Sequence, residues 1–382
     1  MALIGGQAGA MRQGETRPAV GHGGAADSGK AIWTDQSRLS PARWTMTIVV
    51  LVGVSVVVLV GCLRFGAEDI SFNEAVRILL MTLGIGQSVD ATGTADVILM
   101  QVRLPRVLMA FMVGSSLAAV GVSLQALLRN PLADPYVLGI SSGAALGAGL
   151  AILFGIGSGL FAASALPLCA FVGGLLSIVV VYRIAASYGY LPIHTLLLAG
   201  VILNAIFSAL LMFITSMMEP NRSFGMMSWL MGTLTAPDYP ALLILAVYLL
   251  VGTFFLFRHA SSLNVLTLGE ESARSLGVDV ERVKKSVFFA GALLTGAVVS
   301  VSGMIGFVGM VIPHAVRMMI GPDHRLLFPA SALIGGAFLM IADTLARTVL
   351  APGEIPVGVV TALAGGPFFI YLLMSRKSGL VA

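Results

Sequence analysis

Long apolar segments recur along most of this chain, and they constrain its fold more than any other feature. A helix that crosses the hydrocarbon core of a bilayer needs about 20 predominantly apolar residues. Charged residues make up only 10% of the chain and hydrophobic residues 57%, so the bilayer is the solvent for most of it. The composition therefore predicts an all-α polytopic membrane protein. The segments that qualify or nearly qualify as spans are residues 46–63, 104–127, 137–156, 164–184, 192–216, 238–257, 286–303, 326–346 and 358–375.

A further, shorter apolar segment at residues 306–319 contains Pro313. Charge decides whether it spans, because Lys and Arg gather in the cytoplasmic loops of membrane proteins. With ten spans and a cytoplasmic N-terminus, most of the 22 basic residues fall inside, whereas nine spans would set the two halves in conflict from residue 304 onward. We therefore predict ten transmembrane helices with the N- and C-termini cytoplasmic. The basic residues left outside are Arg64, Arg77, Arg103, Arg106, Arg222 and Arg347.

Residues 1–45 differ from the rest, because they are mostly small and polar and cannot bury enough surface to order themselves. We expect a flexible cytoplasmic tail ahead of a ten-helix transmembrane domain at residues 46–377. The tail contains Gly24 to Lys30, a near match to a phosphate-binding loop, but Ala31 stands where Ser or Thr should reach a magnesium ion. The chain therefore shows no ATP site of its own, and energy from ATP would come through a partner.

Two connections on the predicted outer side are long enough to hold structure of their own. Residues 64–103 contain Ser71 followed three residues later by Glu74, a spacing typical of a capping box at the start of a helix. Residues 217–237 contain Trp229, a residue type enriched at the membrane interface. We expect one short surface helix in each connection.

The longest predicted cytoplasmic connection is residues 258–285. Its part 268–282 alternates charged and small residues and contains Gly269 and Gly277, which predicts two short helices with a glycine elbow. A solvated linker is the plainer interpretation, but an apolar side requires either the membrane surface or another protein as a partner. That side consists of Leu268, Ala273, Leu276 and Val278.

Side chains that carry chemistry are sparse in the predicted spans. Asp343 is the one clear acid within a span and precedes Arg347 by four residues on the same helix face, which predicts a local ion pair. The histidines lack ligand spacing, and Cys62 and Cys169 lie in separate apolar segments. We therefore expect no metal, cofactor or disulfide. No arrangement suggests catalysis, and the scattered basic residues do not indicate nucleic-acid binding.

In combination, several motifs resemble the permease subunits of bacterial ATP-binding-cassette importers for iron chelates, haem and vitamin B12, the FecCD family. The resemblance covers about residues 46 to 375. The motifs that carry it are Arg103-Leu-Pro-Arg106, Gln125-Ala-Leu, Asn130-Pro-Leu-Ala-Asp134-Pro, Leu138-Gly with Ser142-Gly, Trp229-Leu-Met-Gly232, the run Leu268 to Gly277, Gly306-Phe-Val-Gly-Met-Val-Ile-Pro-His314, Pro356-Val-Gly-Val-Val-Thr361 and Gly365-Gly-Pro-Phe.

The resemblance implies a homodimer of permease subunits with ten spans each in the bacterial inner membrane, surrounded by membrane lipid. It also implies two separate ATP-binding subunits and a periplasmic substrate-binding protein. Residues that match the element coupling the permease to its ATPase are Leu268, Gly269, Glu270, Glu271, Arg274, Leu276 and Gly277. Positions that match the docking arginines for the binding protein are Arg103, Arg106 and Arg347.

On the residues alone, Arg103 and Arg106 could instead anchor a helix end at the interface. Asn204, in the span that starts near Leu191, is expected to line the pathway, and the inner turn 128–136 either contacts the ATPase or packs beneath 268–282. The implied function is import of an iron chelate, with haem favoured over a ferric siderophore, by alternating access. The alternatives are a cobalamin importer and, against the scarcity of intramembrane charge, an ion-coupled secondary transporter.

Overall fold

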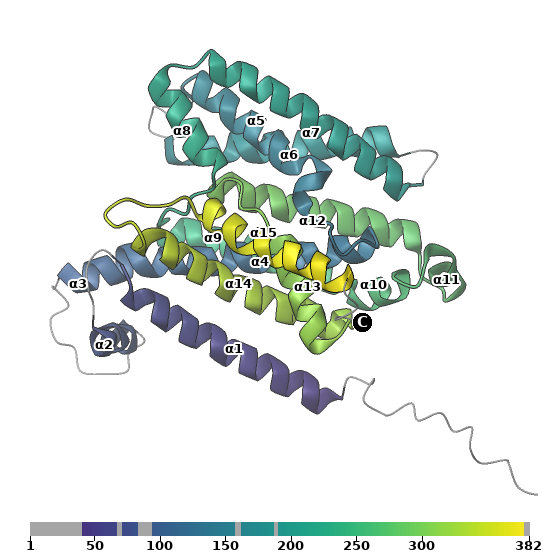
Figure 1. Ribbon diagram of the computed structural model, residues 1–382, viewed down its shortest axis with the longest axis horizontal. Helices are drawn as coiled ribbons and strands as arrows, with labels where there is room; N and C mark the ends of the chain where they lie inside the picture. The colour runs from purple at the N-terminus through teal and green to yellow at the C-terminus, as the bar shows by residue number, and fades with distance from the viewer. Residues whose placement is uncertain (1–39, 67–70, 83–93, 157–161, 187–189, 378–382) are drawn as a thin grey trace, which may run out of the picture. The chain divides into compact units, whose positions relative to one another are not determined.

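The computed structural model describes residues 40–66, 71–82, 94–156, 162–186 and 190–377, and its regular elements there are helices. Residues 44–382 form one compact unit, to which the following description applies. Most of the predicted tail and part of the outer loop 64–103 lie outside the described residues. The helices are α1 Pro41–Arg64, α2 Phe72–Thr82, α3 Thr94–Val97, α4 Leu104–Leu127, α5 Ile140–Leu153, α6 Ala162–Ala185, α7 Ile193–Ser216, α8 Pro220–Leu230, α9 Tyr239–Phe257, α10 Ala260–Leu266, α11 Glu270–Ser275, α12 Val280–Ser302, α13 Val308–Ile320, α14 His324–Thr348 and α15 Val357–Lys377, with a π-helix η2 at Ile98–Arg103 and a 3₁₀-helix η3 at Pro135–Leu138 (Figure 1).

Each predicted apolar segment falls on a helix. Within the described residues, seven helical segments are long and apolar enough to cross a membrane, and α5, α13 and α15 are shorter apolar helices. The short surface helices expected in the two outer connections are α2 and α8. The Ser71 cap of α2 is confirmed, because the backbone N–H of Glu74 donates to the Ser71 hydroxyl at 3.3 Å.

Two helices start earlier than predicted, one at a proline and one at a capping aspartate. α1 begins at Pro41 rather than residue 46, since proline suits the first position of a helix. α12 begins at Val280 rather than residue 286, because the Asp279 carboxylate accepts from the Arg282 N–H at 3.1 Å. The first turns of α12 therefore belong to the stretch predicted as a connection.

The predicted span 137–156 was wrong at its start. The chain first makes the helix η3, where the Asp134 carboxylate accepts from the Tyr136 N–H at 2.8 Å. Gly139 then takes a positive φ of 83°, which favours glycine, and α5 starts only at Ile140. Burial raises the pKa of Asp134 to about 6, although its bond from the backbone works in the opposite direction.

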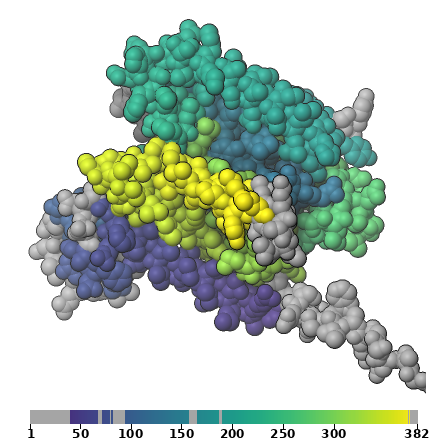
Figure 2. Space-filling model, viewed as in Figure 1, coloured from purple at the N-terminus to yellow at the C-terminus, as the bar shows by residue number. Residues whose placement is uncertain are grey.

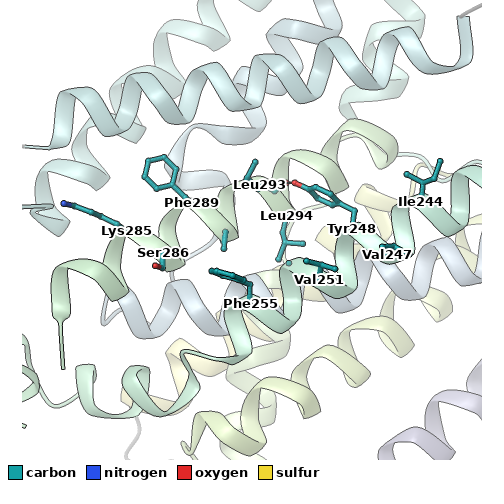
Figure 3. Close-up of a pocket in the computed structure, with 12 residues that line it drawn as sticks. Ile244, Val247, Tyr248, Val251, Phe255, Lys285, Ser286, Phe289, Leu293 and Leu294 are labelled. Atoms are coloured by element: carbon teal, nitrogen blue, oxygen red, sulfur yellow. Dashed lines mark hydrogen bonds between the residues drawn. The ribbon is translucent and has the colours of Figure 1, made fainter. Parts of the chain in front are cut away.

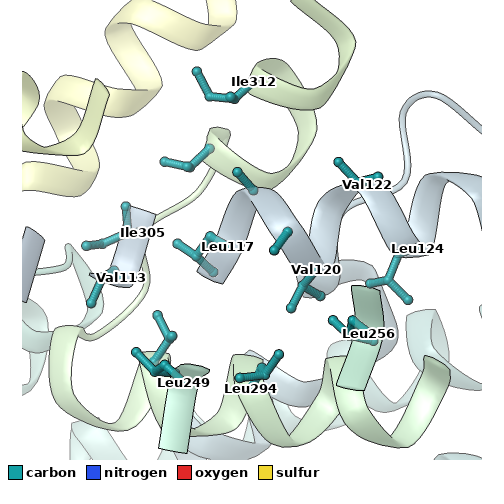
Figure 4. Packing of buried hydrophobic residues seen from close by; sticks show 14 of the residues in the cluster. Val113, Leu117, Val120, Val122, Leu124, Leu249, Leu256, Leu294, Ile305 and Ile312 are labelled. Atoms are coloured by element: carbon teal, nitrogen blue, oxygen red, sulfur yellow. The ribbon is translucent and has the colours of Figure 1, made fainter. Parts of the chain in front are cut away.

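Helix α4 lies at the centre of the membrane unit, in contact with α9, α12, α13 and α14. In the apolar segment that contains α4, 78% of the residues in an 18-residue stretch are buried, whereas the corresponding share is 17% in α1 and in α9. Helices α1 and α9 therefore present most of their apolar surface outward. Figure 4 shows Val113, Leu117 and Val120 of α4 among buried side chains of the neighbouring helices. This packing fixes where the ends of the other helices lie.

Glycines allow the closest of these contacts. Gly143 of α5 packs closely on α6, because a methyl group on Gly143 would lie 2.8 Å from the carbonyl oxygen of Gly173. In the same way, a methyl group on Gly121 of α4 would overlap the backbone of Gly309 in α13. The helix backbones therefore touch where these glycines lie.

Helix α13 is short because an irregular stretch, residues 303–307, precedes it. Gly303 and Phe307 in this stretch both have positive φ, of 66° and 69°. Helix α15 packs on α13 and α14 and contributes the yellow surface of the face shown in Figure 2. The non-helical backbone of residues 303–307 is tolerated in a membrane protein where other protein segments surround it.

We predict that Gly121→Leu destabilises the protein, because overpacking at a backbone contact typically costs about 1–3 kcal/mol and sometimes more. Gly53→Leu in α1 is the matched control, since nothing lies within 4 Å of a methyl group there. Thermal unfolding of the purified protein in detergent compares the two. Equal melting temperatures would show that the α4–α13 contact is not tight.

Candidate functional site

The segment predicted to couple to an ATPase presents two leucines to the outside. Leu268 and Leu276 are 70% and 66% exposed, and they flank the short helix α11. Ala273, between them, is fully buried. Gly269 and Gly277 have φ of 120° and 83°, so a side chain at either position would strain the turn. The apolar side predicted from sequence is thus divided between an outward and an inward face.

The predicted pair of short helices needs correction. α11 is one of them, but the helix after the Gly277 elbow is the start of the long α12. The other short helix, α10, comes before α11 and contacts α4 and α14. Its Asn264 side chain donates to Asp323 at 2.8 Å and accepts from the His324 N–H at 2.8 Å. Burial alone would raise the pKa of Asp323, but hydrogen bonds from Arg325 and Asn264 lower it to about 2.

A buried ammonium group holds α11 against α12. The Lys284 side chain is only 3% exposed, and its Nζ lies 3.2 Å from Glu270 Oε2 and 2.6 Å from Glu281 Oε1. Arg274 lies farther from both carboxylates, at 3.6 Å and 3.7 Å. Removing one partner of such a buried ion pair is strongly destabilising. Glu270 therefore pairs with a buried group, whereas its neighbour Glu271 is exposed.

The same charged group reaches the chain just before α7. Lys284 Nζ donates to the Leu191 carbonyl at 3.0 Å, and the Leu191 N–H donates to Glu281 Oε2 at 2.9 Å. We call Glu270, Glu281, Lys284 and the Leu191 backbone the coupling anchor. The prediction missed Lys284 and Glu281. Their spacing of three residues at a helix start was the available signal, but sequence does not show which of Lys284 and Lys285 is buried.

The inner turn lies beside this segment. A methyl group on Gly269 would be 3.9 Å from Nη1 of Arg129, and Arg129 itself has a positive φ of 47°. The turn and α11 therefore meet on one side of the molecule. This placement agrees with packing of the inner turn against 268–282.

At the opposite end of α4, two arginines share two carboxylates. Arg106 donates to Asp343 Oδ1 at 3.1 Å through Nε and holds Glu354 with both Nη atoms, at 3.1 Å and 2.9 Å. The predicted pair of Asp343 and Arg347 is confirmed, with Oδ2 and Nε 3.1 Å apart. The Asp343 side chain is fully buried, while Glu354 is 55% exposed. Two positive and two negative charges make this arginine cluster neutral.

Arg103 points inward rather than to a docking surface. Its side chain is buried, and Nη1 donates to the carbonyl oxygens of Leu63 and Arg64 at 2.9 Å and 3.0 Å. The last carbonyls of a helix lack partners within the helix, so Arg103 caps the end of α1. The expectation that Arg103 is presented to a partner, or that it extends to the interface as an anchor, does not agree with this geometry.

Asn204 joins three elements. Its Nδ2 donates to the carbonyl oxygen of Tyr136 in η3 at 3.0 Å, and its Oδ1 accepts from the Ser142 hydroxyl of α5. The side chain is half-buried on α7. Asn204 therefore ties α7 to η3 and to α5, and its amide is already engaged.

An apolar cavity of about 380 Å³ lies between the end of α8, the stretch after α12 and the start of α15. Its walls include two methionines and the start of α15, which carries Leu363 at 69% exposure. No charged residue contributes to the lining among the described residues. The lining residues are Leu230, Met231, Met304, Gly358, Val359, Ala362 and Leu363.

Known proteins are similar in sequence to this chain over most of its length. The cobalamin import system permease protein BtuC of Halobacterium salinarum is 45% identical over 287 residues, which cover 74% of this chain and 75% of that protein. The hemin transport system permease protein HmuU of Yersinia pestis is 42% identical over 279 residues, covering 73% of this chain and 83% of that protein.

A solved structure agrees in fold. It is described as an inward-facing conformation of a candidate metal-chelate type ABC transporter, and it superimposes with a TM-score of 0.73 at 31% identity over 87% of this chain and 99% of that chain. A family model described as the FecCD transport family matches residues 44–375. The chain therefore belongs to the FecCD transport family and is a multi-pass inner-membrane permease subunit of an ATP-binding-cassette importer of the metal-chelate type.

Proposed function

We propose that this permease imports a macrocyclic metal complex, with haem favoured, from the periplasm to the cytoplasm by alternating access. Two copies would form the pathway, with two ATP-binding subunits and a periplasmic binding protein. The relatives named for hemin and cobalamin support this substrate class, since both ligands are large metal-containing rings. Cobalamin is the second candidate because the cobalamin relative is 45% identical.

The observation that carries the proposal is a pair of exposed leucines beside α11, a helix that a buried lysine holds in place. Leu268 and Leu276 need an apolar partner, while Lys284 fixes α11 to α12 and to the chain before α7. A push on α11 would therefore be transmitted to two long helices at once. Glu271, also exposed, is suited to a polar contact at the rim of such an interface.

The orientation proposed from charge places this segment in the cytoplasm. Trp44 near the start of α1 donates to the Arg325 carbonyl at the start of α14 at 3.1 Å, so these two helices begin on the same side. We propose ten passes, with α5, the stretch 303–320 and α15 as the shorter ones and both termini in the cytoplasm. The cytoplasmic tail in this proposal is the part of residues 1–45 that precedes α1, which begins at Pro41.

The binding protein is proposed to dock over the arginine cluster. Arg106 already holds a carboxylate in a bidentate way, and the exposed Glu354 could be exchanged for a carboxylate of the partner. Arg347 holds Asp343 in place beneath it, and Arg103 supports the same surface by capping α1. The charge balance of the cluster would be preserved during such an exchange.

The pathway is proposed to begin at the apolar cavity beside Met231 and Met304. Methionine side chains adapt to irregular shapes, which suits a bulky ring that must pass rather than stay. Asn204 would act on the pathway indirectly, because its bonds to Tyr136 and Ser142 hold α7 against the break before α5.

Reconstitution in vesicles with the ATP-binding subunits and the binding protein tests the function. Uptake of haem should require ATP and survive collapse of the proton and sodium gradients by ionophores, and excess unlabelled haem should compete better than cyanocobalamin or a ferric hydroxamate. Uptake that ignores ATP and stops with an ionophore would support a secondary transporter instead. Asp343, the intramembrane acid, is already paired with two arginines.

We predict that Leu276→Asp and Leu268→Asp each reduce ATP-dependent uptake at least about tenfold, because a charge in an apolar contact costs more than ~1.4 kcal/mol. Met319→Asp at the end of α13 is the matched control, since it also places a carboxylate on an exposed apolar side chain outside the inner turn and the segment 268–282. Co-purification of the ATP-binding subunit measures the contact. Full retention of that subunit by both variants would contradict the coupling role.

Lys284→Met should uncouple ATP hydrolysis from transport and lower thermal stability, because removing one partner of a buried ion pair costs about 3–5 kcal/mol. Adding Glu270→Gln should recover part of the stability, since it removes one of the carboxylates left unpaired. Arg282→Met is the control, as this side chain is 83% exposed. The measurement is ATP hydrolysed per substrate imported, and a wild-type ratio for Lys284→Met would refute the anchor.

Arg106→Gln is expected to weaken docking of the loaded binding protein at least about tenfold, or ~1.4 kcal/mol. Glu354→Gln is expected to preserve or tighten docking, because it removes the competing carboxylate and leaves Arg106 bonded to Asp343. Surface plasmon resonance at two salt concentrations measures both variants. Weaker docking in Glu354→Gln together with normal docking in Arg106→Gln would reverse the proposed roles.

A further inference from the structure

An apolar groove of about 740 Å³ runs between α9 and α12, apart from both sites described above. The residues that line it on α12 include the small Ser286 and Ala290. Larger apolar side chains form the walls, among them Phe255 and Leu293. Figure 3 shows the groove with Lys285 at one end and Ile244 at the other.

The polar end of the groove is positively charged. Within the part of the chain that the structure describes, no acidic side chain lies at ion-pair distance from the Lys285 ammonium. The nearby Glu281 is instead held by Lys284 and by the Leu191 N–H. The ring of His259 lies 6.5 Å from that of Phe255, a groove residue. The exposed Arg258 directly follows α9, and the exposed Arg183 lies near the end of α6.

Helix α6 reaches this end of the groove through an aromatic contact. The ring of Tyr182, the residue before Arg183, lies 5.0 Å from that of Phe289, which lines the groove. Helix α6, which carries Arg183, therefore contacts a wall of the groove. Arg282, a turn away on α12, is paired with Asp279 and points into solvent.

The rest of the groove offers no site for a polar ligand. The Tyr248 hydroxyl donates to the Leu293 carbonyl at 3.2 Å, so it is already satisfied. A neighbouring transmembrane helix is also a poor fit, because a span about 30 Å long and 10 Å wide occupies on the order of 2,000 Å³. The 740 Å³ available suits one or two slender chains.

We propose that this groove binds one anionic phospholipid of the cytoplasmic leaflet. The acyl chain lies along the apolar walls, and the phosphate contacts Lys285, with the Ser286 hydroxyl placed to donate to an ester or phosphate oxygen. The proposal rests on the orientation in which this end of α12 faces the cytoplasm. Basic groups at that surface attract anionic lipids, and an apolar groove ending in such groups distinguishes a bound lipid from the bulk bilayer.

The location gives a bound lipid a measurable effect on the protein. Lys285 directly follows Lys284 of the coupling anchor in the sequence, and both groove walls are helices that adjoin the segment 258–279. A lipid in the groove would hold the end of α9 and the start of α12 together. The segment 258–279 runs between these two points. Thermal stability should therefore rise with occupancy.

The experiment uses the full complex with its ATP-binding subunits in a mild detergent. Native mass spectrometry follows retention of phosphatidylglycerol and of phosphatidylcholine with identical acyl chains, while inorganic phosphate at the same concentration tests the headgroup alone. We expect phosphatidylglycerol to be retained at least about fivefold better than phosphatidylcholine and to raise the melting temperature, and inorganic phosphate to do neither.

Two variants separate the headgroup from the chain. Lys285→Gln should reduce the preference for phosphatidylglycerol to below about twofold while Lys285→Arg retains it, and Ala290→Phe should reduce retention of both lipids by filling the groove. Arg282→Gln is the matched control on the same helix. Equal retention of the two lipids by the wild-type complex, or the same loss in Arg282→Gln as in Lys285→Gln, would overturn the proposal.

Other outcomes also decide the question. If Ala290→Phe alters the number of permease copies in the complex, the groove is an interface between copies and the lipid proposal fails. Should a variant not assemble, the wild-type comparison of the two lipids still decides. Loss of ATP-dependent uptake in the wild type with normal lipid preference would refute the transport proposal alone, so the two failures are distinguishable.

Discussion

The close contact of α4 with α13 and α14 is the interaction on which the rest of the structure depends. Where Gly121 meets Gly309 and Gly114 meets Gly335, the helix backbones touch without side chains between them. In a bilayer, lipid tails solvate leucine as well as a neighbouring helix does, so close van der Waals packing holds helices together. Because α4 runs from the arginine cluster to the inner turn, its packing positions both candidate docking surfaces.

The second constraint is that backbone polar groups inside the membrane must find hydrogen-bond partners within the protein. Its consequences are visible wherever the helices break or end. Arg103 satisfies the last carbonyls of α1, and Asn204 adds a second donor to the carbonyl of Tyr136, which already accepts from the Gly139 N–H at the break before α5. Asp343 is fully buried but lies between two arginines. The charges of this chain are therefore used for holding elements together as much as for meeting partners.

Much of this could be predicted from the sequence, because it depends on local patterns. Apolar length located the long helices, the spacing of Ser71 and Glu74 located α2, and the spacing of Asp343 and Arg347 indicated their ion pair. Predictions that needed three-dimensional knowledge were less accurate. The direction in which Arg103 points depends on where α1 ends in space, and the burial of Lys284 rather than Lys285 depends on which face of α12 the α11 segment covers.

The sequence by itself determined the membrane class, the positions of the helices and the family, because apolar length and motif order are properties of the chain. Only the tertiary structure decided which charged groups neutralise each other. Glu354, Lys284 and Glu281 gain their roles from residues distant in sequence, and the groove beside Lys285 is formed by residues of both α9 and α12. Such contacts between distant segments leave no periodic signal in a single sequence, since each partner is an ordinary residue on its own.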